Sequence, residues 1–415
     1  MFIIERAAPF SCEEQKRKSF PGGTSPQNQC GGRSDKVPRL QVKTIDSEIA
    51  TAYVNTCKGT LHVPFGWCLA IFVGNSPRPL LKRDIMERNQ PSGRAVAAFA
   101  MTHTPGLGNG LEDPPKEQVE RLMAGFAEAR AILDEARPEL VIGLINDHFD
   151  MFGLDNMPTF SIGIADDHWG PPASAENWLQ MKRGRIAGNA DYAADIYREA
   201  VNSGFDLYRS GSVELVHNML MPFKFLRPER DLPIVPIFTN CLAPPLPSMA
   251  RCYALGEVIG RVIARRPERV ALIASGGISH WPPFAKEDGP EDDELNRRML
   301  KVQRVGPGGR ELDPGVRDLI HKREAEMAAS GRNLINVEWD KEVLAAFERG
   351  DKKSLLEMTY EEIERDGGNG GHEIAMWVMM MGALNGAPSR TIVYEAVKEW
   401  MGGVGLISYD RRLSL

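Results

Sequence analysis

Apolar runs and helix-like apolar faces alternate along the chain from residue 95 onwards. Residues 95–101 form an apolar run, and residues 140–145 form a nearly continuous one. Runs of this length are typical of strands that are buried on both faces of a sheet. Between them, residues 117–136 carry apolar side chains at roughly helical spacing. This pattern predicts a strand, a helix and a second strand in succession.

The same alternation continues toward the C-terminus. Short apolar segments at 232–238 and 270–274 predict further strands, and residues 190–202 and 248–265 have the pattern of helices. Residues 290–365 are mainly helical and charged in character, and a last apolar helix is expected to begin near residue 371. Strands that alternate with helices of this length predict an α/β fold whose central, mostly parallel sheet is flanked by helices.

The first 93 residues differ from the rest in composition. Residues 11–40 are rich in Gly, Pro, Ser, Gln and Lys, and prolines interrupt the chain at 77, 79 and 91. Residues 1–95 contain 14 basic and 8 acidic side chains, whereas the remainder contains 36 and 48. We therefore expect a partly disordered N-terminal extension over residues 1–93 and one domain over residues 94–415. Met86 is a plausible alternative start.

Composition argues against several classes of protein. The chain is 42% hydrophobic with a net charge of −6, so it can build a core and is not expected to bind nucleic acid. No apolar run approaches the roughly 18 residues of a membrane-spanning helix, and no signal-peptide pattern opens the chain. The six cysteines include no CxxC pair, which favours free thiols in a reducing cytoplasm over a zinc ribbon. We expect a cytoplasmic protein with no membrane partner.

Three of the eight histidines directly follow predicted strands. His103 follows the run at 95–101, His148 follows the run at 140–145, and His280 follows the run at 270–274. Ligands of open α/β sheets bind in crevices beyond the carboxyl ends of the strands. A single histidine after a strand is more often a hydrogen-bonded structural group. Three such placements favour a site in which these side chains converge.

A carboxylate joins this set near the C-terminus. A glycine-rich turn leads into a Met- and Trp-rich helix and places Glu373 in its first turn, where a negative charge is favoured. A capping role would suit an exposed Glu, but a carboxylate beside buried surface needs a cation or hydrogen-bond donors. Two neutral imidazoles and one carboxylate form the facial triad of non-haem Fe(II) oxygenases.

The sequence lacks complete hydrolase motifs. His372-Glu373 is half of an H-E-x-x-H zinc motif, but position 376, where the second histidine belongs, is Met376. No G-x-S-x-G nucleophile elbow is present, and the glycine-rich stretches do not form phosphate-binding fingerprints. A metal-dependent hydrolase therefore remains only a minor alternative.

At this point the chain resembles a known family, the class III (LigB-type) extradiol ring-cleavage dioxygenases, and most closely its 2,3-dihydroxyphenylpropionate 1,2-dioxygenase branch. The resemblance covers residues 95 to about 410, in the same order and at similar spacing. The matching stretches are MTHTP at 101–105, PELV at 138–141, NDHF at 146–149, NMP at 156–158, PIVPIF at 233–238, PPLP at 244–247, SGGISHWPP at 275–283, HEI at 372–374 and EWMGG at 399–403.

The resemblance implies specific roles. His103, His148 and Glu373 would ligate Fe(II), and His217 and His280 would be the acid/base pair. Histidine titrates near neutral pH and suits either proton transfer. We favour His280 on the oxygen side as the acid, with His217 as its partner. The substrate would be a small aromatic dihydroxy compound that reacts with O2 and opens beside its two hydroxyls, and the enzyme would be a homo-oligomer.

The sequence also departs from the family pattern. Val216 and Asn218 flank His217 where relatives have Asp and Gly, and Trp281 replaces an expected Gln. An Asp before the histidine would orient its ring and raise its basicity. We therefore expect Asn218 and Trp281 to contact the substrate, and a heterocyclic analogue such as a dihydroxypyridine is an alternative to a catechol. A metal-binding or protein-binding module of the same fold is the alternative of another class.

Overall fold

The computed structural model describes residues 94–290 and 292–409. The predicted N-terminal extension over residues 1–93 lies outside them. The described chain forms an eight-stranded sheet with the order β6-β3-β7-β2-β8-β1-β10-β9. The strands are β1 (Arg94–Met101), β2 (Leu140–Asn146), β3 (Phe160–Gly163), β6 (Tyr208–Ser210), β7 (Ile234–Thr239), β8 (Arg269–Ser275), β9 (Ser389–Val397) and β10 (Gly402–Tyr409).

The centre of the sheet is parallel and its flanks include antiparallel pairs. Strands β7, β2, β8 and β1 run in one direction, whereas β3 pairs antiparallel with β7 and β10 pairs antiparallel with β1. Every residue of β2 is buried, as is typical of a strand that is covered on both faces. The predicted α/β fold with a mostly parallel central sheet is confirmed.

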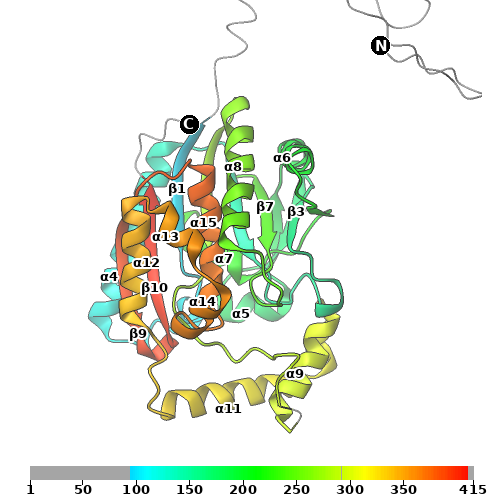
Figure 1. Ribbon diagram of the computed structural model, residues 1–415, viewed down its shortest axis with the longest axis vertical. Helices are drawn as coiled ribbons and strands as arrows, with labels where there is room; N and C mark the ends of the chain where they lie inside the picture. Colours follow the sequence, from blue (N-terminus) through cyan, green and yellow to red (C-terminus); the bar gives the residue numbers. More distant parts are fainter. Residues whose placement is uncertain (1–93, 291, 410–415) are drawn as a thin grey trace, which may run out of the picture. The chain divides into compact units, whose positions relative to one another are not determined.

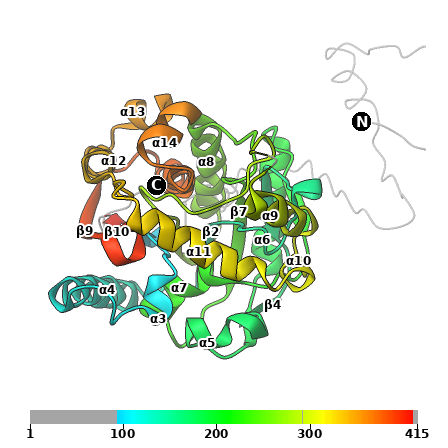
Figure 2. The same cartoon turned by 90° about the horizontal axis from the view of Figure 1, so that it is seen from below.

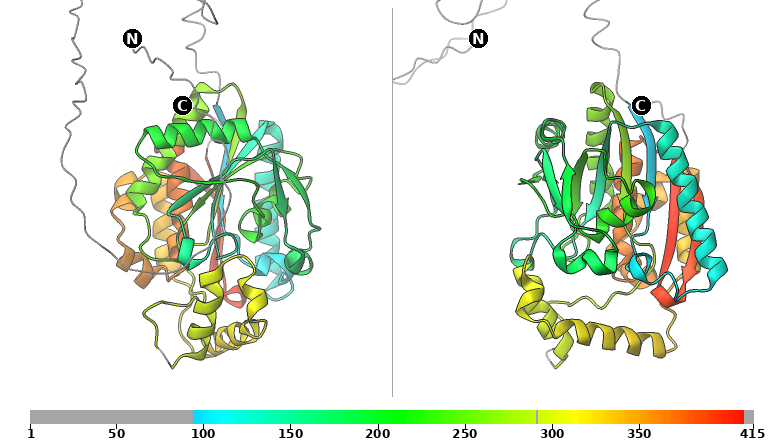
Figure 3. Two further views of the ribbon diagram at one scale, coloured as in Figure 1. Left: turned by 90° about the vertical axis from the view of Figure 1, so that its right-hand side faces the viewer. Right: turned by 180° about the vertical axis from the view of Figure 1, so that it is seen from behind.

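Helices cover both faces of this sheet (Figures 1 and 3). One face carries α6 (Ala190–Asn202), α8 (Met249–Arg265), α12 (Val337–Arg349) and α15 (Ile374–Ala383), and the other carries α4 (Lys116–Ala136) and α7 (His217–Leu226). Helices α8 and α15 approach closely at Gly256, where an added Cβ would lie 1.9 Å from the Met379 carbonyl oxygen. This close packing fixes α15, and therefore the residues that enter it.

Three helices pack around an apolar cluster of their own, and we call them the helical cap. It consists of α9 (Glu294–Val305), α10 (Gly309–Leu312) and α11 (Val316–Ala329), and it has a small apolar cluster of its own, built on Leu295, Met299, Val302 and Val316. The cap lies at the carboxyl ends of the parallel strands (Figure 1), and α11 crosses in front of those ends in the view from below (Figure 2). The predicted helical character of residues 290–365 is confirmed.

The remaining elements connect these layers. A small hairpin of β4 (Asp167–Gly170) and β5 (Gly184–Ala187) lies outside the main sheet, and the short helices are α3 (Gly106–Asn109), α5 (Glu176–Leu179), α13 (Lys352–Glu357) and α14 (Tyr360–Asp366). Single 3₁₀ turns occupy Leu154–Asn156, Ala173–Ala175, Gly371–Glu373 and Lys398–Trp400. None of the helices within residues 94–409 that the structure describes is long and apolar enough to cross a membrane.

Candidate active site

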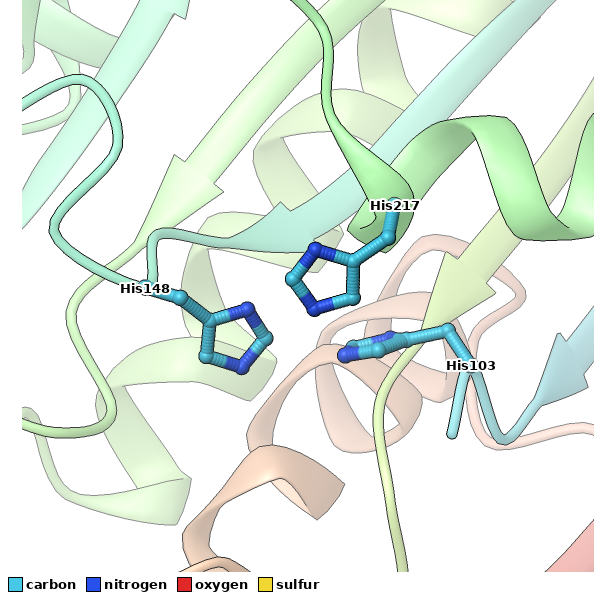
Figure 4. Close-up of side chains that lie close together, drawn as sticks. All are labelled: His103, His148 and His217. Carbon is cyan, nitrogen blue, oxygen red and sulfur yellow. The ribbon is translucent and has the colours of Figure 1, made fainter. Parts of the chain in front are cut away.

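Three histidines meet at the carboxyl ends of the central strands. His103 follows β1, His148 follows β2, and His217 is the first residue of α7. Their rings point toward one another (Figure 4), and each ring offers a nitrogen that lies within 4.8 Å of the other two. The rings of His148 and His217 stack with centroids 4.7 Å apart. The parallel order of β1, β8 and β2 brings these residues together although they are far apart in sequence.

Glu373 lies against two of these histidines. It ends the 3₁₀ turn Gly371–Glu373, one residue before α15, and its side chain is only 2% exposed. Its Oε1 is 2.8 Å from His148 Nε2, and its Oε2 is 3.6 Å from His103 Nε2. The Asn146 amide donates to Oε1 at 2.8 Å, and the Gly277 backbone N–H donates to Oε2. The carboxylate is therefore held in one orientation toward the histidines.

His280 completes the cluster from the end of β8. Its Nε2 lies 3.9 Å from Glu373 Oε1. Its Nδ1 is 2.9 Å from the Ile278 carbonyl, to which it can donate, so that Nε2 remains as the nitrogen that faces the carboxylate. Two glycines make room for the ring, because a Cβ at Gly277 or Gly370 would lie 2.3 or 2.2 Å from its atoms.

Burial and mutual charge set the protonation of these groups. Burial lowers the pKa of His103 to about 3, so this imidazole is neutral near pH 7. Burial alone would raise the pKa of Glu373, but His103, His148 and His280 outweigh it, and the net pKa is well below its usual range. Burial also opposes protonation of His148, yet its contact with Glu373 raises the pKa of His148 overall. The site thus contains a persistent carboxylate next to a neutral imidazole.

This donor set fits a divalent transition metal. Within the described part of the chain, the ion pairs of Glu373 are all with histidines. A buried carboxylate that lacks a permanent cation is costly unless a cation or donors compensate it. His148 Nδ1 is also buried without a hydrogen-bond partner. Two imidazoles and a carboxylate are ligands typical of non-haem iron, and His217 offers a third imidazole at the same place.

The two predicted substrate-contacting residues lie in different surroundings. Asn218 is fully buried, and its Nδ2 donates to the carbonyl of Asn146 at the end of β2. Trp281 is partly exposed, and its ring packs so closely on Gly368 that a Cβ there would lie 2.7 Å away. Five of the seven predicted residues therefore share one cluster: His103, His148, His217, His280 and Glu373. Asn218 contacts the backbone of Asn146 next to this cluster, and Trp281 follows His280 in the sequence.

Several neighbours of the cluster were not singled out from the sequence. Asn146 holds Glu373, and its position two residues before His148, at the end of a buried apolar run, could have identified it. Phe284 stacks beside His148 with ring centroids 6.0 Å apart, and Trp178 lies 5.5 Å from His217. The two aromatic residues occur in loop or short helical segments without a periodic pattern, so no local signal marks them.

Comparison with known proteins identifies the family. The sequence profile described as "Catalytic LigB subunit of aromatic ring-opening dioxygenase" matches residues 97–405. Enzymes called 2,3-dihydroxyphenylpropionate/2,3-dihydroxicinnamic acid 1,2-dioxygenase are similar to this chain. The one from Burkholderia vietnamiensis is 35% identical over 76% of this chain and 97% of its own length. The one from Paraburkholderia phymatum is 34% identical over 76% of this chain and 97% of its own length. The one from Paraburkholderia xenovorans is 32% identical over 75% of this chain and 96% of its own length.

These matches confirm the resemblance found in the sequence, both to the family and to its 2,3-dihydroxyphenylpropionate 1,2-dioxygenase branch. The matched region contains all five clustered side chains, from His103 to Glu373. The chain belongs to the LigB family of aromatic ring-opening dioxygenases.

Proposed function

We propose that this chain is a non-haem Fe(II)-dependent extradiol dioxygenase that opens a catechol-type ring beside its two hydroxyls. One observation carries the proposal: the buried Glu373 carboxylate lies among His103 and His148 at the carboxyl ends of two parallel strands, and its ion pairs are with imidazoles alone among the described residues. The names of the relatives, which specify 2,3-dihydroxylated aromatic acids, support a substrate with two adjacent hydroxyls.

In this proposal His103, His148 and Glu373 hold the iron. When bound, iron would supply a centre that the two substrate oxygens can chelate and through which ring electrons can reach O2. The chain itself neutralises part of the positive charge through Glu373, whose carboxylate is fixed by Asn146 and the Gly277 amide. The neutral state of His103 leaves a ring nitrogen available as a ligand.

His217 and His280 would move the protons. If His280 Nδ1 donates to the Ile278 carbonyl, its Nε2 can accept and return a proton on the inner side of the site. His217 stacks on the His148 ring with centroids 4.7 Å apart, and it also lies against Trp178. We assign His280 to the oxygen side and His217 to the substrate hydroxyl.

Oxygen uptake tests the function directly. Protein loaded anaerobically with Fe(II) is given catechols with and without a carboxylate side chain, and dihydroxypyridines, in an oxygen electrode. Uptake that is stoichiometric with the loss of one ring type supports the proposal and selects carbocycle or heterocycle. Zn(II)-loaded protein is the matched control and should take up no oxygen. No uptake across the panel with bound iron confirmed would refute the proposal and favour a hydrolase or a binding module.

We further propose that residues 94–415 form the catalytic domain. The family profile, which matches residues 97–405, supports this boundary. A chain that begins at Met86 should keep kcat within about twofold of the full chain if the preceding residues take no part in the chemistry. We also propose a homo-oligomer, which light scattering on the full chain would test.

A further inference from the structure

One aromatic side chain connects the helical cap with the cluster of histidines. Phe284 is half-buried, and its ring lies nearly parallel to that of His148, with centroids 6.0 Å apart and an interplanar angle of 15°. It also meets the ring of Phe149 edge-on, at 6.4 Å and 69°. Phe284 thus presents a flat apolar face beside a candidate metal ligand.

The His148 side of this contact is rigid. The carboxylate of Asp147 accepts hydrogen bonds from the backbone amides of residues 150–152 at 2.9–3.1 Å, which closes a tight turn around His148 and Phe149. Phe149 has a positive φ of 61°, a conformation that costs a non-glycine residue energy and persists only where surrounding contacts enforce it. These contacts fix the backbone of the turn, and the His148 ring is held through its Nε2, which lies 2.8 Å from both Asn146 Nδ2 and Glu373 Oε1.

The Phe284 side is held by the cap instead. Phe284 and Ala285 pack against the cap cluster that contains Leu295 and Met299. The cap is joined to the rest of the fold by ion pairs, among them Arg304 with Asp155 at 2.9 Å. The position of the Phe284 ring therefore depends on the packing of α9 and α11 as well as on its contacts with the His148 and Phe149 rings.

We propose that Phe284 is a specificity-determining residue against which the aromatic ring of the substrate packs, and that the helical cap sets its position. This inference rests on the proposed function, because it requires a planar aromatic substrate bound at the ligands beside Phe284. In this proposal, a substrate that chelates a metal held by these ligands extends its ring toward the cap, which lies at the carboxyl ends of the parallel strands. The flat face of Phe284 offers it an offset-stacked contact, which aromatic pairs prefer. The class of ligand is a planar aromatic diol.

Replacement of Phe284 by leucine removes the flat aromatic face but leaves a large apolar side chain in its place. Phe284→Leu should weaken anaerobic binding of the catechol by about 2- to 13-fold, which is the contribution of an aromatic pair beyond its buried area. Iron content should not change, because Phe284 offers no ligand atom. Phe284→Tyr keeps the ring and should bind like the wild type. Phe225→Leu is the matched control, since Phe225 stacks on Phe126 at 4.6 Å within another cluster.

A second variant tests the role of the cap. Met299→Ala removes part of the apolar cluster on which Phe284 packs, so it should weaken anaerobic binding of the catechol, as Phe284→Leu does. Equal substrate affinity in wild type and Phe284→Leu, with iron bound, would overturn the inference, as would an equal loss in Phe225→Leu. These outcomes differ from failure of the proposed function, in which wild-type protein takes up no oxygen with any dihydroxy aromatic.

Discussion

The buried carboxylate of Asp340 gives the sharpest test of the electrostatics near the site. Asp340 is on α12, and its side chain is fully buried. Oδ1 accepts from the Ser279 backbone N–H at 2.8 Å, and Oδ2 accepts from the Tyr394 hydroxyl at 2.6 Å. Ser279 directly precedes His280, so these bonds hold the loop that carries the candidate acid/base residue. Asp340→Asn keeps the shape of the side chain, removes its charge and replaces one acceptor oxygen by an NH2 donor.

The expected change in the free energy of unfolding with pH follows from the pKa of Asp340. Burial raises its pKa from 3.8 to about 6, although the hydrogen bonds from Tyr394 and Ser279 oppose the shift. The folded state therefore holds this proton more tightly than the unfolded state. That stabilisation is complete below pH 4 and is lost as pH rises through 6, by roughly 3 kcal/mol at about 1.4 kcal/mol per pKa unit. Asparagine does not titrate, so the stability of Asp340→Asn relative to wild type should rise by that amount between pH 4 and 8.

Urea unfolding of the metal-free full chain, followed by tryptophan fluorescence from pH 4 to 8, measures this difference. Asp351→Asn is the control whose titration lies outside this range. Asp351 caps α13, and the Ser354 backbone N–H donates a hydrogen bond that holds the pKa of that carboxyl below its usual value. The stabilisation from Asp351 is therefore lost only below about pH 4, and the difference between Asp351→Asn and wild type should stay nearly constant from pH 4 to 8. A difference for Asp340→Asn that stays constant with pH, in protein that folds, would refute the reasoning. The kcat of Asp340→Asn should stay within about threefold of wild type, because the asparagine oxygen can still accept the hydrogen bond from the Ser279 backbone N–H.

The remaining predictions concern the cluster itself. Gly370→Ala should keep iron but lower kcat by about tenfold or more in steady-state kinetics, since its Cβ would lie 2.2 Å from His280 Nε2. Glu373→Gln and His148→Ala should lower iron content in metal analysis, whereas His280→Ala should keep iron and lose about 10²–10⁴-fold in turnover; the reverse pattern would contradict the assignment. Chelation of the iron should lower the Tm, because saturation at 100 Kd stabilises by about 2.7 kcal/mol; an unchanged Tm would argue against a metal site.

The parallel centre of the fold could be predicted because its signals are local. Strands β2 and β8 are buried on both faces, which requires nearly unbroken apolar runs, and α4 buries one face, which requires helical spacing. The same logic located His103, His148 and His280, since polar residues that end such runs lie at one edge of a parallel sheet. Each of these inferences needed only one continuous stretch of the sequence, the longest being residues 117–136.

The edges of the sheet could not be predicted in this way. Strand β10 contains three glycines and β9 is half-buried without a regular alternation, so neither has a period that distinguishes a strand. The short strands β3 and β6 are defined by their partners rather than by their own composition. His217 had no local signal either, because it begins a helix and follows no strand. Family resemblance alone singled it out.

Two buried carboxylates, Asp340 and Glu373, have unusual positions that can be seen in the sequence and roles that cannot. Asp340 is three residues before Val343 and seven before Phe347, which places an acid on the buried face of α12, where helical spacing calls for an apolar side chain. Glu373 breaks the pattern in the same manner before α15. Both exceptions were visible in the sequence, but the role of each depends on partners that lie far along the chain. Glu373 meets imidazoles and is suited to a metal, whereas Asp340 meets a phenol and an amide and is suited to holding a loop.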